Sequence, residues 1–372
     1  MHGRPRSQKH KVHGEAERKR AALYASLVRE ALGRFRRWTA GADGREGEDE
    51  ELMRMAAAVI EVNPECYSMW SVRKTVTLAR LDRGAGGAAE AAARAELELS
   101  ERGLRRNVKS YSAWYHRKWV IAEPRLAPQV SLPTELALVD KLLAVDSRNF
   151  HAWGYRRFVA QRLGRSVGDE LEYSMRQIER NFSNYSAWHY RSVLMAAGAA
   201  VGGEDGGVGA GAAAGANVRL SSFSSSMAVP LAADVLRREF SLVQQALYTE
   251  PSDQSGWFYQ NWLQGCCLLA DADAADGRRA LLSAEADACR EIIQEERESA
   301  ARGGGAGGAP SPAAIKWPTL ALARLVDVGA EARDGETPEA LYAELRAADA
   351  QRAGMYDALL RARRRAAAAV AR

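Results

Sequence analysis

Apolar residues between positions 136 and 143 recur at the spacing of one helix face. The stripe consists of Leu136, Val139, Leu142 and Leu143. These positions stand at i, i+3, i+6 and i+7, which is typical of an amphipathic helix with one buried side. The stripe begins with a Glu followed by an apolar residue, and such pairs recur at Glu96-Leu97, Glu135-Leu136, Glu170-Leu171 and Glu239-Phe240. We therefore expect a helix in each of these four places.

A more specific pattern opens 11 residues after each of these Glu residues. It has an Asn or Asp, an aromatic residue four positions later, a Trp after three more and an Arg after another three. Its Trp and Arg residues are Trp70 and Arg73, Trp114 and Arg117, Trp153 and Arg156, and Trp188 and Arg191. A fifth copy around Trp257 is relaxed at the acidic, aromatic and Arg positions. The Asn or Asp suits a turn or N-cap, and the Trp and Arg share one face of the helix that follows.

The spacing of these Trp residues predicts the fold class. They follow one another at steps of 44, 39, 35 and 69 residues, and periods of this size belong to helical hairpin repeats. We expect an all-α protein, a right-handed α-α superhelix (solenoid) of helical hairpins that forms a crescent. The Trp residues are expected as wedges in the core, and each Arg as a link between neighbouring hairpins through carboxylates or carbonyl groups.

Low-complexity segments divide the predicted repeats. We expect a basic N-terminal arm and first helix over 1–40, the repeats over 41–330, and a C-terminal helix and basic tail over 331–372. A Gly/Ala/Ser-rich insertion at 196–226 accounts for the long last step between Trp residues, and 301–314 and 84–93 are predicted as shorter loops of the same kind.

Composition narrows the class of protein. Hydrophobic residues make up 47% of the 372 residues, enough for a sizeable core, and a net charge of +5 does not indicate nucleic-acid binding. The basic ends are either solvated helix faces or docking surfaces for an acidic partner. Only four cysteines occur, none in a C-x-x-C pair, so we expect no zinc site from this chain alone and reduced thiols in a cytoplasmic protein. We expect neither a signal peptide nor stable membrane insertion.

The repeats resemble those of protein prenyltransferase α subunits. The sequences of two copies are similar to repeats of the Rab-type geranylgeranyltransferase. The two copies are the runs 149–159 and 181–192. The opening Met1-His2-Gly3-Arg4, the run around Trp257 and Lys316-Trp317-Pro318 share this similarity. The resemblance covers about 1–195, 231–265 and a short segment near 316. It implies the compact form of the subunit, without the immunoglobulin-like insert and leucine-rich-repeat tail of some members.

The resemblance implies one half of an enzyme. Its partner is a β subunit, bound as an obligate heterodimer, which carries the zinc and the isoprenoid pocket. The pair is expected to transfer geranylgeranyl from geranylgeranyl diphosphate to the C-terminal cysteines of Rab GTPases presented by a Rab escort protein. The chain alone is expected to be inactive. The alternatives are the α subunit of farnesyltransferase or geranylgeranyltransferase type I acting on CaaX proteins, a non-catalytic helical-repeat scaffold, and an RNA-binding helical repeat, which the modest charge disfavours most.

The resemblance also implies individual site residues. Lys109 and Tyr111 match the family's diphosphate-side residues in the second repeat, and Phe150 and His151 match its aromatic-His pair in the third. Phe150 stands where the family has a tyrosine, so this position lacks the phenolic hydroxyl. Lys109 as an ordinary solvated side chain and His151 as a packing residue remain alternatives. His2 is a further candidate, as a zinc ligand in the site of the β subunit.

Overall fold

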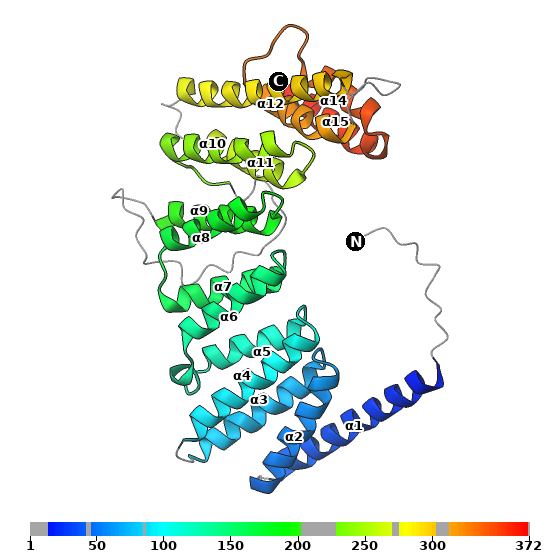
Figure 1. Ribbon diagram of the computed structural model, residues 1–372, viewed down its shortest axis with the longest axis vertical. Coiled ribbons are helices and arrows are strands. Elements are labelled where there is room, and N and C mark those ends of the chain that lie inside the picture. The colour runs from blue at the N-terminus through cyan, green and yellow to red at the C-terminus, as the bar shows by residue number, and fades with distance from the viewer. Residues whose placement is uncertain are drawn as a thin grey trace. The chain divides into compact units, whose positions relative to one another are not determined.

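The computed structural model describes residues 14–41, 46–84, 87–201, 228–269, 275–302 and 312–370. Within these ranges all regular secondary structure is helical, and the predicted all-α class of helical hairpins is confirmed (Figure 1). The chain divides into two compact units, Met1–Leu163 and Gly164–Arg372.

The first unit contains seven α-helices among its described residues. Their bounds are α1 (Glu15–Ala40), α2 (Glu46–Val62), α3 (Tyr67–Asp82), α4 (Ala88–Arg106), α5 (Tyr111–Ala122), α6 (Leu132–Val145) and α7 (Phe150–Leu163). They pair as the hairpins α2–α3, α4–α5 and α6–α7, with α1 packed on α2. Each hairpin carries one copy of the Trp motif at the start of its second helix.

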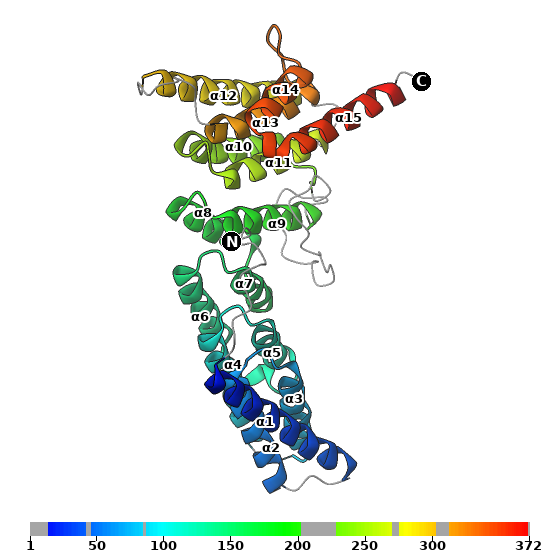
Figure 2. The same cartoon turned by 90° about the vertical axis from the view of Figure 1, so that its right-hand side faces the viewer.

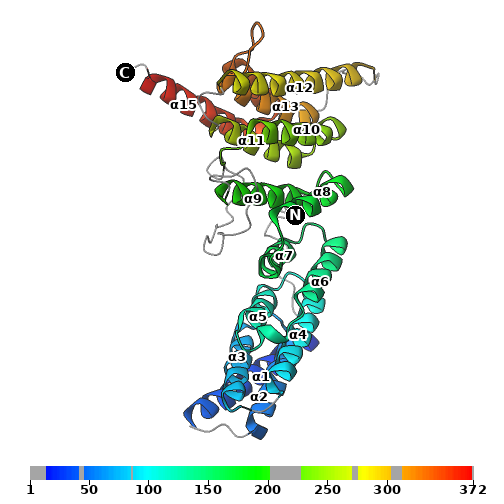
Figure 3. The ribbon, with the colours of Figure 1, turned by 90° about the vertical axis from the view of Figure 1, so that its left-hand side faces the viewer.

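The second unit has the same scheme, with eight α-helices in its described part. Their bounds are α8 (Val167–Arg180), α9 (Tyr185–Val201), α10 (Ala233–Thr249), α11 (Gln254–Leu269), α12 (Ala275–Arg302), α13 (Pro312–Asp327), α14 (Pro338–Ala348) and α15 (Ala353–Val370). Consecutive helices pair again, and Figure 3 shows α8–α9 and α10–α11 as successive layers within this unit. The fourth and fifth Trp motifs begin α9 and α11.

Local sequence signals explain where several helices begin. The side chains of Ser110 and Ser131 accept hydrogen bonds from the backbone N–H groups of Ala113 and Thr134 at the starts of α5 and α6. Ser166 and Asp169 form a reciprocal capping box at the start of α8. Such caps satisfy N–H groups that have no partner inside the helix.

Two expectations about the chain's organisation need correction. The segment 84–93 is not a loop throughout, because α4 already begins at Ala88 and its Ala93 is buried. The part after residue 331, expected to hold one helix, contains α14 and α15. An Ala-rich run interrupted by charged residues looks like a low-complexity loop in the sequence. It can still form a helix, because alanine has the highest helix propensity. Several predicted features lie outside the described residues: His2, the first part of the basic arm, residues 202–226 of the predicted insertion and residues 303–311 of the predicted loop.

Candidate functional site

Each motif Trp fixes the turn that precedes its helix. In all five copies the indole N–H donates to the carbonyl oxygen six residues earlier; the acceptors are Pro64, Val108, Ser147, Phe182 and Pro251, at 2.8–2.9 Å. The five indoles are buried, from 0% to 5% exposed. The expected core wedges are therefore confirmed. The hydrogen bond adds a second role, because it ties the turn to the core.

The turn itself is built by the Asn or Asp that opens the motif. The Asn107 side chain accepts a hydrogen bond from the Lys109 backbone N–H at 3.1 Å, and Asp146 and Asn181 do the same for the residue two positions on. These Asx turns agree with the predicted turn role of the position. They also mean that Lys109 lies in a turn of fixed shape, directly before α5.

Three of the motif Arg residues form buried links to the Glu of the first helix of the next hairpin. Arg73 of α3 donates two hydrogen bonds to Glu96 of α4, at 2.9 and 2.6 Å. Arg117 of α5 donates two to Glu135 of α6, both at 2.7 Å. In the second unit Arg191 of α9 donates two to Glu239 of α10, at 2.7 and 2.6 Å.

A second residue, on the other helix of the hairpin that contains the Glu, also bonds to the same carboxylate. Two positions after the Trp, Tyr155 donates its hydroxyl to Glu135 at 2.5 Å, and Tyr259 donates to Glu239 at 2.7 Å. His116 occupies this position in its repeat, with Nε2 2.8 Å from Glu96. Each of these carboxylates thus bonds to two successive hairpins, and we call this arrangement the Glu link.

Burial and charge act in opposite directions on the pKa of Glu96. Burial alone would raise it, but the Arg73 guanidinium and His116 outweigh that effect and lower the pKa to about 2. His116 is fully buried, and this burial lowers the pKa of its imidazole. The link is therefore an ionised carboxylate held mainly by Arg73, as expected for a paired buried charge.

The fifth repeat contacts a corresponding buried carboxylate, Glu285, without a cation. Gln260 replaces the Arg, and its amide donates to Glu285 of α12 at 3.0 Å, while Gln244 donates to the other carboxylate oxygen at 2.7 Å. Glu285 is 2% exposed. Burial raises the pKa of this carboxyl to about 7, and the two amides only partly counteract it.

The structure brings Tyr111, Phe150 and His151 together at the starts of α5 and α7. The Tyr111 ring lies 4.2 Å from the His151 ring, edge to face, and 5.8 Å from the Phe150 ring. The rings of Phe150 and His151 lie 3.9 Å apart. Tyr111 and Phe150 are 66% and 57% exposed, so this cluster lies at the surface.

Lys109 adjoins the same cluster. Its backbone hydrogen bond and its charge both act on His151, the first raising and the second lowering the imidazole pKa. Burial is the largest effect and lowers the pKa of His151, with Glu65 opposing it and Lys118 adding to it. Lys109 itself is exposed. We call Lys109, Tyr111, Phe150 and His151 the aromatic–lysine cluster.

Two further lysines, not predicted from the sequence as site residues, lie on second helices of hairpins in the same unit. The ammonium of Lys74 lies 4.2 Å from the centre of the Tyr115 ring, and that of Lys118 lies 5.5 Å from the Phe158 ring. Burial lowers the pKa of both amines, and Arg157 lowers that of Lys118 further. The signal was present in the sequence, because each lysine directly follows a motif Arg.

This arrangement can stabilise negative charge. Cations set beside aromatic rings on turns and helices of fixed geometry can hold a diphosphate as its charge grows. Among the described residues, no group of three or more His, Cys, Asp and Glu side chains could hold a metal ion. The aromatic–lysine cluster offers charge and ring surfaces, and the residues around it offer no metal ligand set.

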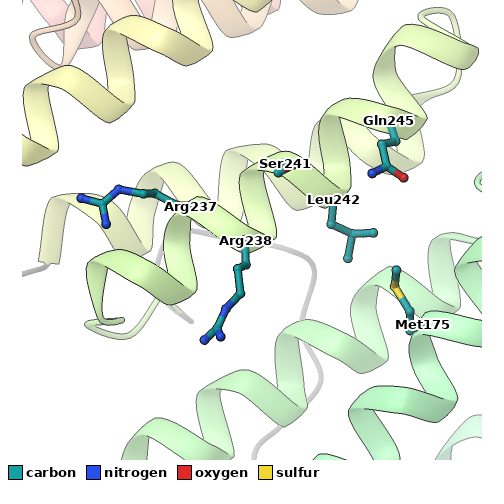
Figure 4. A pocket seen from close by; sticks show the side chains of 6 residues that line it. All are labelled: Met175, Arg237, Arg238, Ser241, Leu242 and Gln245. Atoms are coloured by element: carbon teal, nitrogen blue, oxygen red, sulfur yellow. The ribbon is translucent and has the colours of Figure 1, made fainter.

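A shallow groove of about 400 Å³ lies elsewhere, between α8 and α10 of the second unit (Figure 4). Met175 and Leu242 form its apolar part, and Arg237 and Arg238 stand at one end. None of the predicted site residues lines it. No helix in the described part of the chain is long and apolar enough to cross a membrane.

The comparison with family models identifies the repeats. The model described as "Protein prenyltransferase alpha subunit repeat" matches residues 93–123, 132–163, 167–197 and 236–266. These ranges coincide with the hairpins α4–α5, α6–α7, α8–α9 and α10–α11. The copy around Trp70 lies outside the matched ranges, although its indole bond and Glu link have the same geometry.

Curated relatives agree with this family. The geranylgeranyl transferase type-2 subunit alpha of Homo sapiens is 33% identical over 293 residues, 78% of this chain and 45% of the human protein. The Saccharomyces cerevisiae protein of the same description is 30% identical over 57% of this chain and 58% of its own length. The chain thus spans about half the length of the curated relatives it matches.

A solved structure supports the fold alone. It is a chain of Candida albicans protein geranylgeranyltransferase-I, solved in complex with GGPP, and it aligns with a TM-score of 0.59 at 14% sequence identity. The alignment covers 90% of this chain and 89% of the other. The predicted helical-repeat superhelix is confirmed at the level of fold class.

Proposed function

The chain belongs to the protein prenyltransferase α-subunit repeat family, and on that premise we propose that it is the α subunit of a protein geranylgeranyltransferase type II. Its partner is a β subunit, and the pair transfers geranylgeranyl from geranylgeranyl diphosphate to C-terminal cysteines of Rab GTPases. A Rab escort protein presents the substrate in the cytoplasm.

The observation that carries the proposal is the aromatic–lysine cluster. It joins a lysine, a phenol, a phenyl ring and an imidazole from two repeats at the starts of α5 and α7. Beneath it the Glu links and indole bonds fix both helices. A cationic site of fixed geometry stabilises a leaving group more effectively than a mobile one, because little reorganisation is needed during the reaction.

Three of the four cluster residues have a distinct proposed task. Lys109 places its ammonium against the diphosphate, whose negative charge grows as the bond to the isoprenoid C1 breaks. Tyr111 offers a hydroxyl donor to the same group. The pKa of His151 is lowered, so at neutral pH its imidazole is neutral and serves as a donor or a packing surface rather than as a second cation.

Zinc and the isoprenoid pocket belong to the β subunit in this proposal. Zinc bound there would lower the pKa of the substrate cysteine and so favour its thiolate form, the nucleophile. His2 remains a proposed additional ligand for that metal.

Docking of the escort complex is a further proposed role of the basic surfaces. In the tail, Arg363 already pairs with Asp327 and Glu339 within this chain. Arg361, Arg364 and Arg365 are exposed. These three are therefore the tail residues that we assign to an acidic partner surface.

Reconstitution tests the function. The chain is co-expressed with a Rab-type β subunit, and transfer of labelled geranylgeranyl is measured on a Rab that ends in two cysteines, with escort protein present. We expect transfer by the pair and none by the chain alone. Farnesyl transfer to a CaaX peptide without Rab modification would instead identify a farnesyltransferase subunit. Stable pairing without any transfer would indicate a scaffold.

Lys109→Ala tests the site within the same assay. We expect kcat to fall by about 100- to 1,000-fold, the usual cost of losing one charge-stabilising donor, while the heterodimer forms normally. Lys141→Ala, a change at another exposed lysine in α6, is the matched control and should leave kcat unchanged. An equal loss of turnover and heterodimer formation would make Lys109 a structural residue.

A further inference from the structure

A cleft of about 280 Å³ lies within the second unit, between α11, α13 and the beginning of α15. Figure 2 shows α15 passing across this region beside α11 and α13. Its lining combines cationic, amide and aromatic side chains; among them are Phe258, Asn261, Lys316, Trp317, Arg324 and Arg352. None of them belongs to the aromatic–lysine cluster or to a Glu link.

Two of the three cations in the cleft already have an acidic neighbour. Arg352 Nη1 lies 3.0 Å from Asp349 Oδ2, and Lys316 Nζ lies 3.9 Å from the same oxygen. Tyr356 donates its hydroxyl to Asp349 at 3.1 Å. Burial tends to raise the pKa of Asp349, but Arg352 and Tyr356 outweigh it and lower the pKa, so this carboxylate is ionised and serves both cations.

Arg324 is the third cation of the cleft. Its Nη1 donates to the amide oxygen of Asn261 at 2.9 Å, and among the described residues it forms no salt bridge. Burial lowers the pKa of its guanidinium, and only the partial effects of Tyr342 and Tyr356 oppose this. The motif Arg residues are more buried than the half-buried Arg324, and all four are paired with carboxylates, because an unpaired buried charge is costly. Arg324 thus presents guanidinium N–H groups that suit an oxyanion.

Apart from the amides of Gln254 and Gln264, the rest of the cleft is mainly apolar. Trp257 and Tyr356 are buried in its wall, and Met355 is exposed at the start of α15. The rings of Phe258 and Trp317 meet edge to face at 5.7 Å, and the Lys316 ammonium lies 4.7 Å from the centre of the Trp317 ring. A ligand that fits here has an apolar group as well as an anionic group. Contact between an apolar group and the aromatic rings removes apolar surface from water, which favours binding.

We propose that this cleft binds the C-terminal residue of a peptide, with its carboxylate on Arg324 and its apolar side chain between Phe258, Trp317 and Met355. A single carboxylate matches the one cation that lacks an acidic partner. A volume of about 280 Å³ accommodates one such residue, and it is below the lower end of cavities that enclose whole drug-sized ligands. The proposal does not depend on the prenyltransferase assignment.

Isothermal titration of the full chain with N-acetyl-L-phenylalanine tests the proposal, with N-acetyl-L-phenylalanine amide as the neutral counterpart. We expect the acid to bind with a dissociation constant on the order of 1 mM, as for a single anchored residue. The amide should bind at least about ten-fold more weakly, because it cannot form a charged bidentate pair with Arg324. This comparison uses the unaltered chain, so it stands even if a variant fails to fold.

Variants locate the contact. Arg324→Gln should weaken binding of the acid by at least about ten-fold, while Arg346→Gln, a change at an exposed Arg of α14, should leave it unchanged. Equal binding of acid and amide, or full binding by Arg324→Gln, would overturn the proposal. Binding of phenyl phosphate without binding of the acid would overturn it too, because the cleft would then be a phosphate site.

Discussion

Glu96 in the first unit and Glu285 in the second occupy the same position of their hairpins but differ in what holds them. Both are buried, and both accept a hydrogen bond from the second helix of the preceding hairpin. Glu96 meets Arg73 and has a pKa of about 2, whereas Glu285 meets Gln260 and has a pKa of about 7. The residue beside the buried carboxylate, Arg or Gln, thus determines whether that carboxylate stabilises or destabilises the fold at neutral pH.

Removing the cation from a charged Glu link is expected to have the largest effect on this comparison. Arg117→Ala leaves Glu135 buried with Tyr155 but without a counter-charge, so the free energy of unfolding should fall by about 3–5 kcal/mol. Urea denaturation of the purified chain measures this. Arg102→Ala, which removes an exposed ion pair with Glu61, is the control and should cost less than about 1 kcal/mol. A similar small loss for both variants would mean that the Glu links are not energetically distinct.

The two carboxylates should give stability opposite dependences on pH. The pKa of Glu96 is lowered in the fold, so its stabilisation is present above pH 4.5 and is lost as the pH falls toward 2. The pKa of Glu285 is raised, so stability is lost as the pH rises from 4.5 through 7. Each effect amounts to about 3 kcal/mol.

Glu285→Gln separates the second effect from the first. Denaturation midpoints of this variant and of the unaltered chain are measured between pH 5 and 8. We expect the fall in stability across this range to be smaller in the variant by about 2–3 kcal/mol. Identical slopes in the two proteins would show that Glu285 does not titrate there.

Adding a cation beside Glu285 should make this carboxylate resemble Glu96, which is paired with Arg73. Gln260→Arg places a guanidinium beside Glu285, lowers the pKa of this carboxyl and should raise stability at pH 8 by about 1–2 kcal/mol. Thermal unfolding at pH 8 checks the sign. The matched change Gln254→Arg, at the start of the same helix, controls for added charge. A loss of stability in Gln260→Arg alone would show that the core cannot accommodate the longer side chain.

A further expected effect of about the same size concerns the motif Trp, which the two regions share. Trp114→Phe and Trp257→Phe each remove the indole hydrogen bond to the preceding turn while keeping an aromatic wedge. Both should lose about 1–2 kcal/mol, from the hydrogen bond and some packing. Clearly unequal losses, measured by urea denaturation, would mean that the repeats differ at the Trp position as well as at the Arg position.

The sequence predicted the repeat positions well, because a Trp and an Arg at fixed spacing within one helix form a local signal. The hairpins, the core Trp residues and the Arg links to carboxylates follow from it. The partner of each Arg was harder to assign. Glu96 and Glu135 were recognised as markers of a helix, but their pairing with Arg73 and Arg117 depends on how separate hairpins pack.

The candidate site was predicted in part. Lys109, Tyr111, Phe150 and His151 were named from the family resemblance, and the structure brings them together. Lys74 and Lys118 were not predicted, because a lysine after an Arg resembles an ordinary charged surface residue. Their contacts with Tyr115 and Phe158 depend on the packing of separate helices and are seen only in the structure. The loss of charge at Gln260 was visible as a relaxed position, whereas its effect on Glu285 was not.

The link between Arg191 and Glu239 has an evolutionary consequence. It has the same two-bond geometry as the link between Arg117 and Glu135, although 48 residues separate its ends instead of 18. Closing a longer connection costs only about 0.6 kcal/mol for each doubling of length. Segments between hairpins can therefore be gained or exchanged during evolution without altering the hairpins they connect. The same junction is where a reporter domain could be grafted into this chain.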